Sequence, residues 1–436
     1  MKTYHIITYG CQMNEHDSEN IAGILEAMDY EYCDDPFKAD VVVMNTCSVR
    51  EHADKRFFGM LGQFKVRKKE PGDFIMCVCG CMPQQPVIQE KIRKQFSWVD
   101  IVFGTQTIGD FARLLNDRVR TGRHQFSIMA NNPALPEEGN GKRLHEYKAL
   151  VNITYGCNNF CTYCIVPYTR GREKSRSMED IVTEIRGLAA DGVKEVMLLG
   201  QNVNSFRDAN GNGFPTLIRA VNGIDGIERI RFMTSHPKDL SEELIACFRD
   251  CEHLCKHIHL PVQAGSDRVL KRMNRHYDRA RYLDVVRRLR EACPEIAIST
   301  DIIVGFPGET EEDFEDTLSL VREVRYDSAF TFIYSPREGT PAASFEDQIP
   351  EDVKHARFER LVDAVNEISL EKNALYQGKV CDVLVEGRSK KDDATYSGRT
   401  DTFKLVNFRA GCDVVGETVA VRITDSKTFS LEGELA

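Results

Sequence analysis

A run of strand and helix patterns between residues 149 and 334 constrains the fold of this chain more than any other feature. Six short apolar strands recur in it, and amphipathic helical segments such as Met178–Ala190 and Glu311–Val324 lie between them. The predicted strands are Leu150–Thr154, Glu195–Leu199, Arg229–Met233, His257–Pro261, Ala297–Val304 and Phe330–Tyr334. Six strand–helix units in one series predict an incomplete (β/α)6 barrel, in which loops at the carboxyl ends of the strands form the functional site.

Two further units flank this predicted barrel. Alternating strands and helices in the first hundred residues predict a doubly wound parallel sheet, and a period-two pattern after Gly378 predicts a small β-barrel. The strands expected in the first unit are His5–Tyr9, Val41–Met44, Phe74–Val78 and Val99–Phe103. Breaks that contain proline and glycine, 131–141 and 336–350, separate the units. The predicted domains span residues 1–120, 142–373 and 376–436.

The cysteine content indicates metal chemistry rather than a disulfide framework. Fifteen cysteines are an odd number, and no apolar stretch approaches the roughly twenty residues that cross a bilayer. The short apolar run after Met1 does not match a signal peptide. We therefore expect a cytoplasmic protein without a membrane partner, in which spaced cysteines serve metal binding or catalysis. A net charge of -10 argues against broad, non-specific nucleic-acid binding, although it permits a local basic surface.

Cys157, Cys161 and Cys164 form a close group directly after the first predicted strand of the barrel. Protein thiolates hold iron–sulfur clusters, usually through four cysteines. Three thiolates at this spacing leave one iron of a four-iron cluster open to a small molecule. A zinc knuckle is the alternative, but it needs a fourth ligand that the neighbouring sequence does not offer. The spacing therefore predicts an iron–sulfur cluster with one open iron.

Cys11, Cys47 and Cys81 form a second group, which short spacing does not reveal. Each of them follows a predicted strand of the N-terminal sheet. Because the carboxyl ends of parallel strands meet at one edge of a sheet, we expect the three thiols to converge there. They hold a second cluster or they are buried structural cysteines, which are common. Topology alone favours neither interpretation.

Local sequence words surround both cysteine groups and continue along the chain. They are Tyr9–Asn14, Asn45–Arg50, Gly80–Gln84, Val151–Arg176, Leu199–Asn204, Thr234–Asp239, His259–Ser266 and Asp301–Glu309. These words resemble the methylthiotransferases of the radical S-adenosylmethionine superfamily, and the C-terminal β module is similar to a TRAM domain. The resemblance covers essentially all 436 residues. It implies two [4Fe-4S] clusters: Cys157, Cys161 and Cys164 would hold the one that binds S-adenosylmethionine, and Cys11, Cys47 and Cys81 an auxiliary one.

The word Tyr-Gly-Cys-Gln-Met-Asn at Cys11 is typical of the branch that acts on N6-dimethylallyladenosine at position 37 of tRNA. The resemblance implies that the first cluster cleaves S-adenosylmethionine to a 5′-deoxyadenosyl radical, which removes hydrogen from C2 of the adenine. It also implies that the auxiliary cluster delivers sulfur, after methylation by a second S-adenosylmethionine. Other branches act on threonylcarbamoyladenosine or on a ribosomal-protein aspartate. The alternative outside catalysis is an iron–sulfur RNA-binding regulator.

The resemblance further implies the partners of the protein. We expect a tRNA anticodon stem-loop, whose bases unstack at little expense, and an electron donor that the sequence does not identify. We expect a monomer. No side chain is assigned a catalytic role.

Single residues near the predicted cluster are assigned to the cofactor and to RNA. Tyr163, Gln201 and Gly305 are expected to contact S-adenosylmethionine because of their positions beside the cluster or at strand ends, although Gly305 would equally serve a turn. Basic residues are assigned to RNA phosphates, with solvated charged surfaces as the alternative. They are Arg170, Arg172, Arg268 and Lys271.

A third cysteine group is interpreted as packing. Cys247, Cys251 and Cys255 recur at helical spacing, which places them on one face of a helix or at its end. Histidines 253, 257 and 259 lie nearby, so a zinc site is the alternative. The absence of a Cys-x2-Cys pair makes packing the favoured interpretation.

Overall fold

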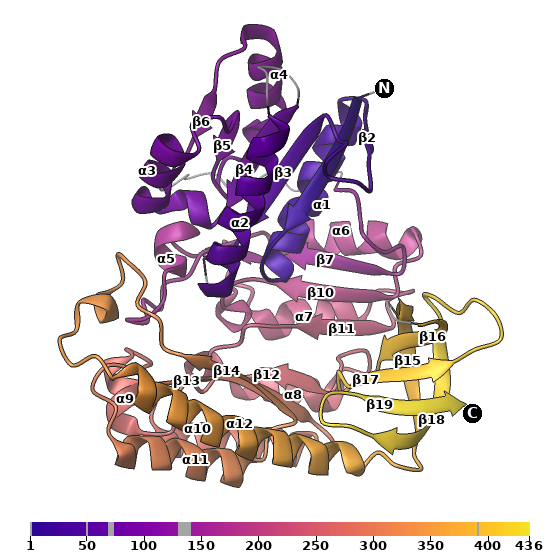
Figure 1. Cartoon of the computed structure of the whole chain (residues 1–436). Coiled ribbons are helices and arrows are strands. Elements are labelled where there is room, and N and C mark those ends of the chain that lie inside the picture. The colour runs from indigo at the N-terminus through magenta and orange to yellow at the C-terminus, as the bar shows by residue number, and fades with distance from the viewer. Residues whose placement is uncertain (1, 49–50, 69–73, 130–140, 390–391) are drawn as a thin grey trace.

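The computed structural model describes residues 2–48, 51–68, 74–129, 141–389 and 392–436. It contains an N-terminal α/β unit, an open barrel of strands and helices, and a closed C-terminal β-barrel (Figure 1), which confirms the predicted fold class. Most of the predicted first linker, residues 131–140, lies outside the described residues. Over the described ranges, no helix combines the length and the apolarity that a membrane span requires.

The N-terminal unit is a six-stranded parallel sheet with helices on both faces. Its strand order is β2-β1-β3-β4-β5-β6. Successive strand residues point to opposite faces, so α1 and α4 pack on one side and α2 and α3 on the other. The elements are β1 (Lys2–Thr8), α1 (Gln12–Ala27), β2 (Tyr30–Tyr32), β3 (Val41–Thr46), α2 (Glu51–Arg67), β4 (Ile75–Gly80), α3 (Pro86–Gln95), β5 (Ile101–Phe103), α4 (Phe111–Thr121) and β6 (Gln125–Ser127).

Six parallel strands of the central unit form an open barrel in two halves. β7, β10 and β11 make one sheet and β12, β13 and β14 the other, and a bridge between Ile230 and Leu254 joins them. β12 ends two residues before the predicted limit because Pro261 has no amide hydrogen for the ladder. The elements are β7 (Lys148–Asn152), β8 (Thr154–Tyr155), α5 (Val166–Thr169), β9 (Lys174–Ser175), α6 (Met178–Ala190), β10 (Glu195–Leu199), α7 (Phe214–Asn222), β11 (Arg229–Phe232), α8 (Glu242–Asp250), β12 (His257–His259), α9 (Asp267–Arg272), α10 (Arg279–Ala292), β13 (Ala297–Val304), α11 (Glu311–Val324), β14 (Ser328–Ile333) and α12 (Glu351–Ala374).

The C-terminal unit is a closed five-stranded barrel in the order β15-β16-β17-β19-β18. Alternate residues of its strands, among them Val383, Val385 and Val421, form the interior, which explains the period-two pattern of the sequence. Its strands are β15 (Val380–Ser389), β16 (Asp392–Arg399), β17 (Leu405–Arg409), β18 (Thr418–Ser426) and β19 (Leu431–Leu435).

Two arginines of β11 attach this barrel to the amino ends of the central strands. Arg229 and Arg231 donate four hydrogen bonds of 2.7–3.0 Å to backbone carbonyl oxygens. The acceptors are Asp382, Arg399, Thr400 and Asp401. Arg231 also pairs with buried Glu195 at 2.7 Å, and the ring of Phe403 stacks on His257 with centroids 4.8 Å apart. The C-terminal barrel is therefore docked against the central unit through specific polar contacts.

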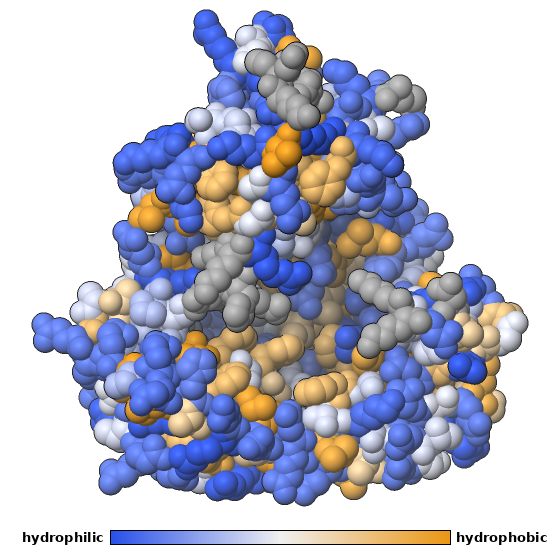
Figure 2. Space-filling model, in the orientation of Figure 1, coloured by the Kyte–Doolittle hydropathy of each residue, from blue (hydrophilic) through white to orange (hydrophobic). Residues whose placement is uncertain are grey.

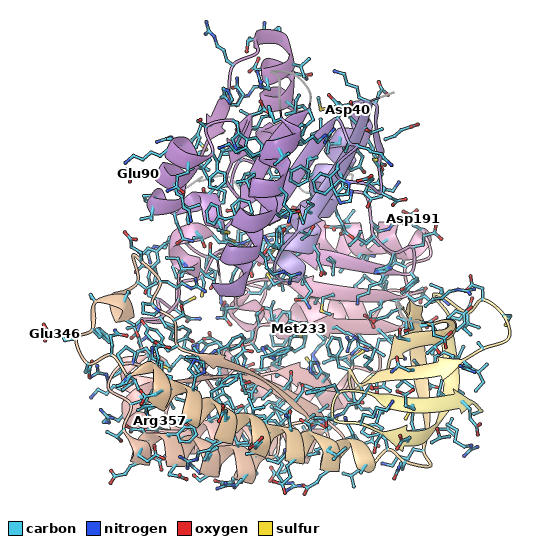
Figure 3. The ribbon with its side chains drawn as sticks, in the orientation of Figure 1. Asp40, Glu90, Asp191, Met233, Glu346 and Arg357 are labelled. Carbon is cyan, nitrogen blue, oxygen red and sulfur yellow. The ribbon has the colours of Figure 1, made fainter. Side chains whose placement is uncertain are left out.

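The N-terminal unit lies over the β7 side of the central barrel (Figure 1). Met13 of α1 packs with Met197 and Leu199 of β10 in a small apolar cluster at this junction. Figure 2 shows the molecule hollowed below the N-terminal unit, with apolar atoms on the floor of the hollow. Met233, which follows β11, lies at the middle of this face (Figure 3).

Candidate active site

The N-terminal cysteines lie at neighbouring strand ends. Cys11 follows β1 and precedes α1, Cys47 follows β3, and Cys81 follows β4. Since these strands are adjacent and parallel, the three residues meet at the carboxyl edge of the sheet. The strand order reverses between β1 and β3, and ligands bind at such a switch point in doubly wound sheets. The structure therefore brings this cysteine group together where the topology favours a ligand.

Gly10 allows Cys11 to approach Cys47. Its φ of +138° is a conformation that side chains rarely adopt. A Cβ atom added to Gly10 would lie 2.8 Å from Cβ of Cys47 and 2.6 Å from Oδ1 of Asn14. Only glycine fits between these groups, so the sequence Gly10-Cys11 is a condition of the cysteine arrangement.

Arg170 reaches this cysteine group from the central unit. Its Nε donates to Sγ of Cys81 at 3.3 Å, and its Nη2 pairs with Asp17 at 2.7 Å. The sequence predicts Arg170 at the RNA surface, but the structure buries it, because the guanidinium neutralises a buried carboxylate beside the sulfur. We therefore reassign Arg170 from RNA binding to the cysteine site.

The second cysteine group occupies the loop between β8 and α5. Cys157 and Cys161 are buried and Cys164 is half-buried. The amide of Cys164 donates to the carbonyl of Cys161 at 2.9 Å, and the amide of Thr162 donates to that of Met273 at 3.0 Å. Burial raises the pKa of the Cys157 thiol, and that of Cys164 to about 12. These thiols stay protonated near neutral pH unless a metal displaces the proton.

Gly156 fixes the entry to this loop. Its φ is +73°, and a Cβ atom there would lie 2.2 Å from the carbonyl oxygen of Arg172. The following residue, Cys157, donates its amide to the carbonyl of Gly171 at 3.1 Å. The loop thus folds back on itself, and the residue before the first cysteine has no room for a side chain.

Arg275 gives the second cysteine group its own buried guanidinium. Its Nη1 donates to Sγ of Cys161 at 3.4 Å, its Nη2 to the carbonyl of Pro261 at 2.8 Å, and its Nε to the hydroxyl of Tyr277 at 3.0 Å. The sequence reasoning missed this residue. Arg275 lies in a stretch, 268–290, with nine lysines and arginines, and nothing in its spacing separates one buried arginine from its more exposed neighbours.

Adjacent residues connect the two cysteine groups. Arg170 contacts the sulfur of Cys81, and the carbonyl of Gly171 accepts the amide of Cys157. The hydroxyl of Thr105 also donates to the carbonyl of Thr169 at 3.1 Å, next to the same dipeptide. Cys81 of the first group therefore contacts Arg170, and Cys157 of the second group contacts Gly171. One dipeptide thus contacts both cysteine groups at the junction of the two units.

Among the buried polar atoms without a hydrogen-bond partner in the described residues, four belong to residues that closely follow β7, β10 and β11. They are Oγ1 of Thr154, Oε1 of Gln201, Oγ of Ser235 and Nε2 of His236. Thr154, Gln201 and Ser235 follow β7, β10 and β11 closely, at the carboxyl ends where βα barrels bind ligands. Since buried polar groups are normally paired, this arrangement fits a polar ligand such as S-adenosylmethionine beside Cys157.

The chemistry of the two cysteine groups suits iron–sulfur clusters. In the described part of the chain, no three histidine, cysteine or acidic side chains converge as around one ion. A four-iron cluster does not require this, because each cysteine binds a different iron. A guanidinium that donates to sulfur in each group also suits a thiolate set that carries negative charge.

The other predicted cofactor residues lie in different surroundings. The hydroxyl of Tyr163 is 3.5 Å from Nη1 of Arg275, which places this ring beside the cysteine loop. Gly305 follows β13 with a φ of +71°, and a Cβ atom there would lie 2.4 Å from Cγ of Lys354. Close packing of α12 therefore accounts for Gly305 by itself.

The remaining predicted RNA residues lie at two places. Arg172 is exposed and its guanidinium lies 4.3 Å from the ring centre of Phe160 in the cysteine loop. Lys271 is exposed on α9. Arg268, on the same helix, pairs with Asp313 and donates to the carbonyl of Gly308. An acidic partner thus offsets the charge of Arg268, whereas Arg172 presents its charge beside the cysteine loop.

Cys247 and Cys251 of the third cysteine group have different contacts from His257 and His259. Cys247 and Cys251 lie beside Arg219, whose Nη1 is 3.4 and 4.0 Å from their sulfurs. His257 and His259 instead contact the hydroxyl of Ser299. No metal-binding set of three forms here within the described ranges.

Comparisons with known proteins place these features in families. Uncharacterized protein family UPF0004 matches residues 3–104, the Radical SAM superfamily matches 151–321, and the TRAM domain matches 374–436. The chain is 53% identical over 433 residues to a tRNA-2-methylthio-N(6)-dimethylallyladenosine synthase of Clostridium botulinum (strain Langeland / NCTC 10281 / Type F), which covers 99% of this chain and 96% of that protein. It is 52% identical over 436 residues to the protein of that name in Caldicellulosiruptor saccharolyticus, covering 100% and 92%.

Solved structures share the fold at low sequence identity. The radical S-adenosylmethionine methyltransferase TsrM from Kitasatospora setae, with cobalamin and a [4Fe-4S] cluster bound, has a TM-score of 0.57 at 14% identity over 79% of this chain and 77% of that one. The cobalamin-dependent S-adenosylmethionine radical enzyme OxsB has a TM-score of 0.50 at 13% identity over 83% and 56%. Both likenesses concern the fold alone.

The open barrel, its cysteine loop and the matching family define the class, a radical S-adenosylmethionine enzyme, with S-adenosylmethionine and an iron–sulfur cluster as cofactors. This confirms the resemblance to the methylthiotransferases that the sequence predicts. Within that class, the identity over nearly the whole chain is decisive. The chain belongs to the family of tRNA-2-methylthio-N(6)-dimethylallyladenosine synthases.

Proposed function

We propose that this chain adds a methylthio group to C2 of N6-dimethylallyladenosine at position 37 of tRNA, with S-adenosylmethionine and two [4Fe-4S] clusters. The family supports the reaction, and it does not favour threonylcarbamoyladenosine, a ribosomal-protein aspartate or a regulator without turnover. The contact of Arg170 and Gly171 with one cysteine of each group carries the two-cluster proposal. Two clusters that both lie next to this dipeptide would be close enough to act on the same substrate atom.

The two cysteine groups hold different clusters in this proposal. Cys157, Cys161 and Cys164 bind the cluster that holds S-adenosylmethionine, with Tyr163 and Gln201 assigned to the cofactor. Cys11, Cys47 and Cys81 bind the auxiliary cluster. When bound, these groups supply one-electron and sulfur chemistry that no side chain offers at an unactivated C–H bond. Arg275 and Arg170 donate N–H groups to one sulfur of each set and stabilise its negative charge.

The junction of the two units suits an adenine with an apolar substituent. Met13, Met197 and Leu199 form a buried apolar cluster there, and Met233 and Phe403 pack partly buried against it. The hollow of Figure 2 opens onto this face. An apolar floor excludes water from the reacting carbon and favours a five-carbon dimethylallyl group by roughly 0.8 kcal/mol for each buried CH2.

The RNA and the other partners complete the proposal. Arg172 is the strongest of the predicted phosphate contacts because it lies exposed beside the cysteine loop, and Lys271 and Arg268 on α9 are secondary ones. We propose a monomer of three domains, 1–120, 142–373 and 376–436, that works in the cytoplasm and takes electrons from a separate donor.

Anaerobic reconstitution tests the proposal. The wild-type chain should bind about eight irons, and a chain with Cys11→Ala, Cys47→Ala and Cys81→Ala about four, because each cluster holds four irons. With reductant and a stem-loop RNA that carries dimethylallyladenosine, the wild type should release 5′-deoxyadenosine and form the methylthiolated nucleoside. The triple variant should release 5′-deoxyadenosine without transferring sulfur. A wild-type chain with only four irons and full methylthiolation would refute the two-cluster proposal.

A second experiment tests the substrate. Mass spectrometry of tRNA nucleosides from a strain that lacks the gene should show dimethylallyladenosine without its methylthio group. Loss of the methylthio group from another nucleoside, with methylthiolated dimethylallyladenosine intact, would show that the substrate assignment is wrong.

A further inference from the structure

Arg170 is a buried charge that belongs to one unit and contacts the other. It follows α5 in the central unit, whereas its partners Asp17 and Cys81 belong to the N-terminal unit, 153 and 89 residues away along the chain. All three side chains are buried, with 8%, 4% and 6% of each residue exposed. A charge at such a junction is retained only where it is paired and hydrogen-bonded.

The geometry fixes the direction of the guanidinium. The ion pair of Nη2 with Asp17 at 2.7 Å holds one corner of the planar group, so that Nε points at Sγ of Cys81 at 3.3 Å. An arginine donates through a rigid fork, and two such contacts leave its plane little freedom. Asp17 therefore orients Arg170, and Arg170 in turn orients the Cys81 sulfur.

We infer that Arg170 is a positioning residue that holds the Cys81 sulfur toward the auxiliary cluster and sets the reduction potential there, with Asp17 as its counter-charge. The inference rests on the proposed function, because it assumes a cluster on Cys11, Cys47 and Cys81. Arg170 is not a ligand of the cluster in this inference, but it donates a hydrogen bond to one of the ligands, Cys81.

Charge determines the sign of the expected effects. Reduction adds negative charge to a cluster, so a nearby positive charge and an N–H donor to sulfur raise its potential. Removing the guanidinium should lower the potential, and removing the carboxylate of Asp17 while Arg170 remains should raise it. Substitutions of Arg170 and Asp17 should thus shift the reduction potential in opposite directions. A merely structural role would not produce opposite shifts.

The test is a redox titration of the auxiliary cluster alone. The full chain with Cys157→Ala, Cys161→Ala and Cys164→Ala is reconstituted, and the cluster signal is followed by electron paramagnetic resonance against potential. On this background, Arg170→Gln should shift the midpoint to more negative values and Asp17→Asn to more positive values. The background chain should bind about four irons.

Arg176 provides the matched control. It lies six residues after Arg170 and is equally buried, and it pairs with Glu184 at 2.7 Å and donates to the carbonyl of Asn152. Arg176→Gln therefore removes a buried arginine of the same segment between α5 and α6, and its partners are not cysteines. This substitution should leave the midpoint unchanged. Equal midpoints for Arg170→Gln, Arg176→Gln and the background chain would overturn the inference.

Two outcomes remain distinguishable. If the background chain binds no cluster, the proposed function fails at its auxiliary site and the inference falls with it. If only Arg170→Gln fails to bind iron, Asp17→Asn decides, because it retains the arginine: a more positive midpoint supports the inference and an unchanged one refutes it.

Discussion

Replacing Arg231 by methionine tests how the C-terminal barrel is held. Arg231 is 3% exposed, and its side chain pairs with Glu195 at 2.7 Å and donates to the carbonyl oxygens of Thr400 and Asp401. Arg231→Met fills a similar volume, but it leaves these acceptors without the guanidinium. We expect the C-terminal barrel to separate from the central unit more often in this variant.

The magnitude follows from the buried ion pair. Removing one partner of such a pair typically costs about 3–5 kcal/mol. Lys148 lies 3.5 Å from Glu195 and still compensates part of the negative charge of Glu195. The lower end, about 3 kcal/mol, therefore applies. Glu195 and Arg231 both lie on central strands, so this cost favours undocking only as far as Glu195 regains water there, and roughly 150-fold is the upper limit for the rise in the undocked population.

Hydrogen exchange with mass spectrometry measures this population. The loop 400–404 is held by its own amide bonds, Thr400 to Lys404 at 3.1 Å and Phe403 to Thr400 at 3.0 Å. When the barrel undocks, these amides lose the packing that protects them, so their exchange should accelerate by up to about two orders of magnitude. Peptides from the N-terminal sheet should exchange as in the wild type and serve as the internal reference.

Arg229→Met is the control for neutral hydrogen bonds. It removes two bonds to carbonyl oxygens and leaves the Glu195–Arg231 pair in place, so the acceleration should be smaller. The double variant Arg231→Met with Glu195→Met should recover much of the lost protection, because replacing both members of a buried pair by apolar residues is often neutral. Equal exchange in Arg231→Met and Arg229→Met, or no recovery in the double variant, would refute the ion-pair reasoning.

Three further predictions concern the cysteine loop, a buried acid and the RNA surface. Gly156→Ala should reduce reconstituted iron by about four per chain, because its Cβ would meet a carbonyl oxygen at 2.2 Å. Gly187→Ala, where a Cβ atom would have nothing within 4 Å, should bind the full amount of iron. Equal iron in both variants would contradict the steric argument. Burial raises the pKa of Glu19 from 4.5 to about 7. The folded chain thus binds this proton more tightly than the unfolded chain, so ionisation of Glu19 lowers the free energy of unfolding as pH rises from about 5 to about 8. Glu19→Gln should therefore flatten the fall of the urea midpoint over that range. An unaltered slope of the urea midpoint against pH would argue against a protonated Glu19. Arg172→Gln should weaken stem-loop binding and reduce the slope of log affinity against log salt by about 0.7–0.9, as measured by fluorescence anisotropy, and an unchanged slope would remove Arg172 from the RNA surface.

The sequence predicts the architecture because its signals are local. Strand–helix alternation and the change to period two follow from which residues face the core, and the central strands Glu195–Leu199 and Ala297–Val304 are confirmed at their predicted limits. The edge strands β2 and β6 are not predicted. They have three residues each and little burial, so they carry no periodic pattern.

The cysteine groups lie where the strand ends predict them, because a parallel sheet brings consecutive strand ends to one edge. The two arginines beside them are different. Arg170 and Arg275 lie in basic stretches of the sequence. Their burial depends on groups such as Asp17 and Cys161, which lie more than a hundred residues away along the chain. Only the packing of separate units decides whether such a charge faces water or a sulfur.

Phe403 has a consequence for where a nucleotide would bind. Its loop reaches from the C-terminal barrel to the amino end of the central strands, where the ring stacks on His257 and packs against the cluster of Met197 and Leu199. That end of the central barrel is occupied by protein, which leaves the hollow below the N-terminal unit as the face on which a nucleotide would bind.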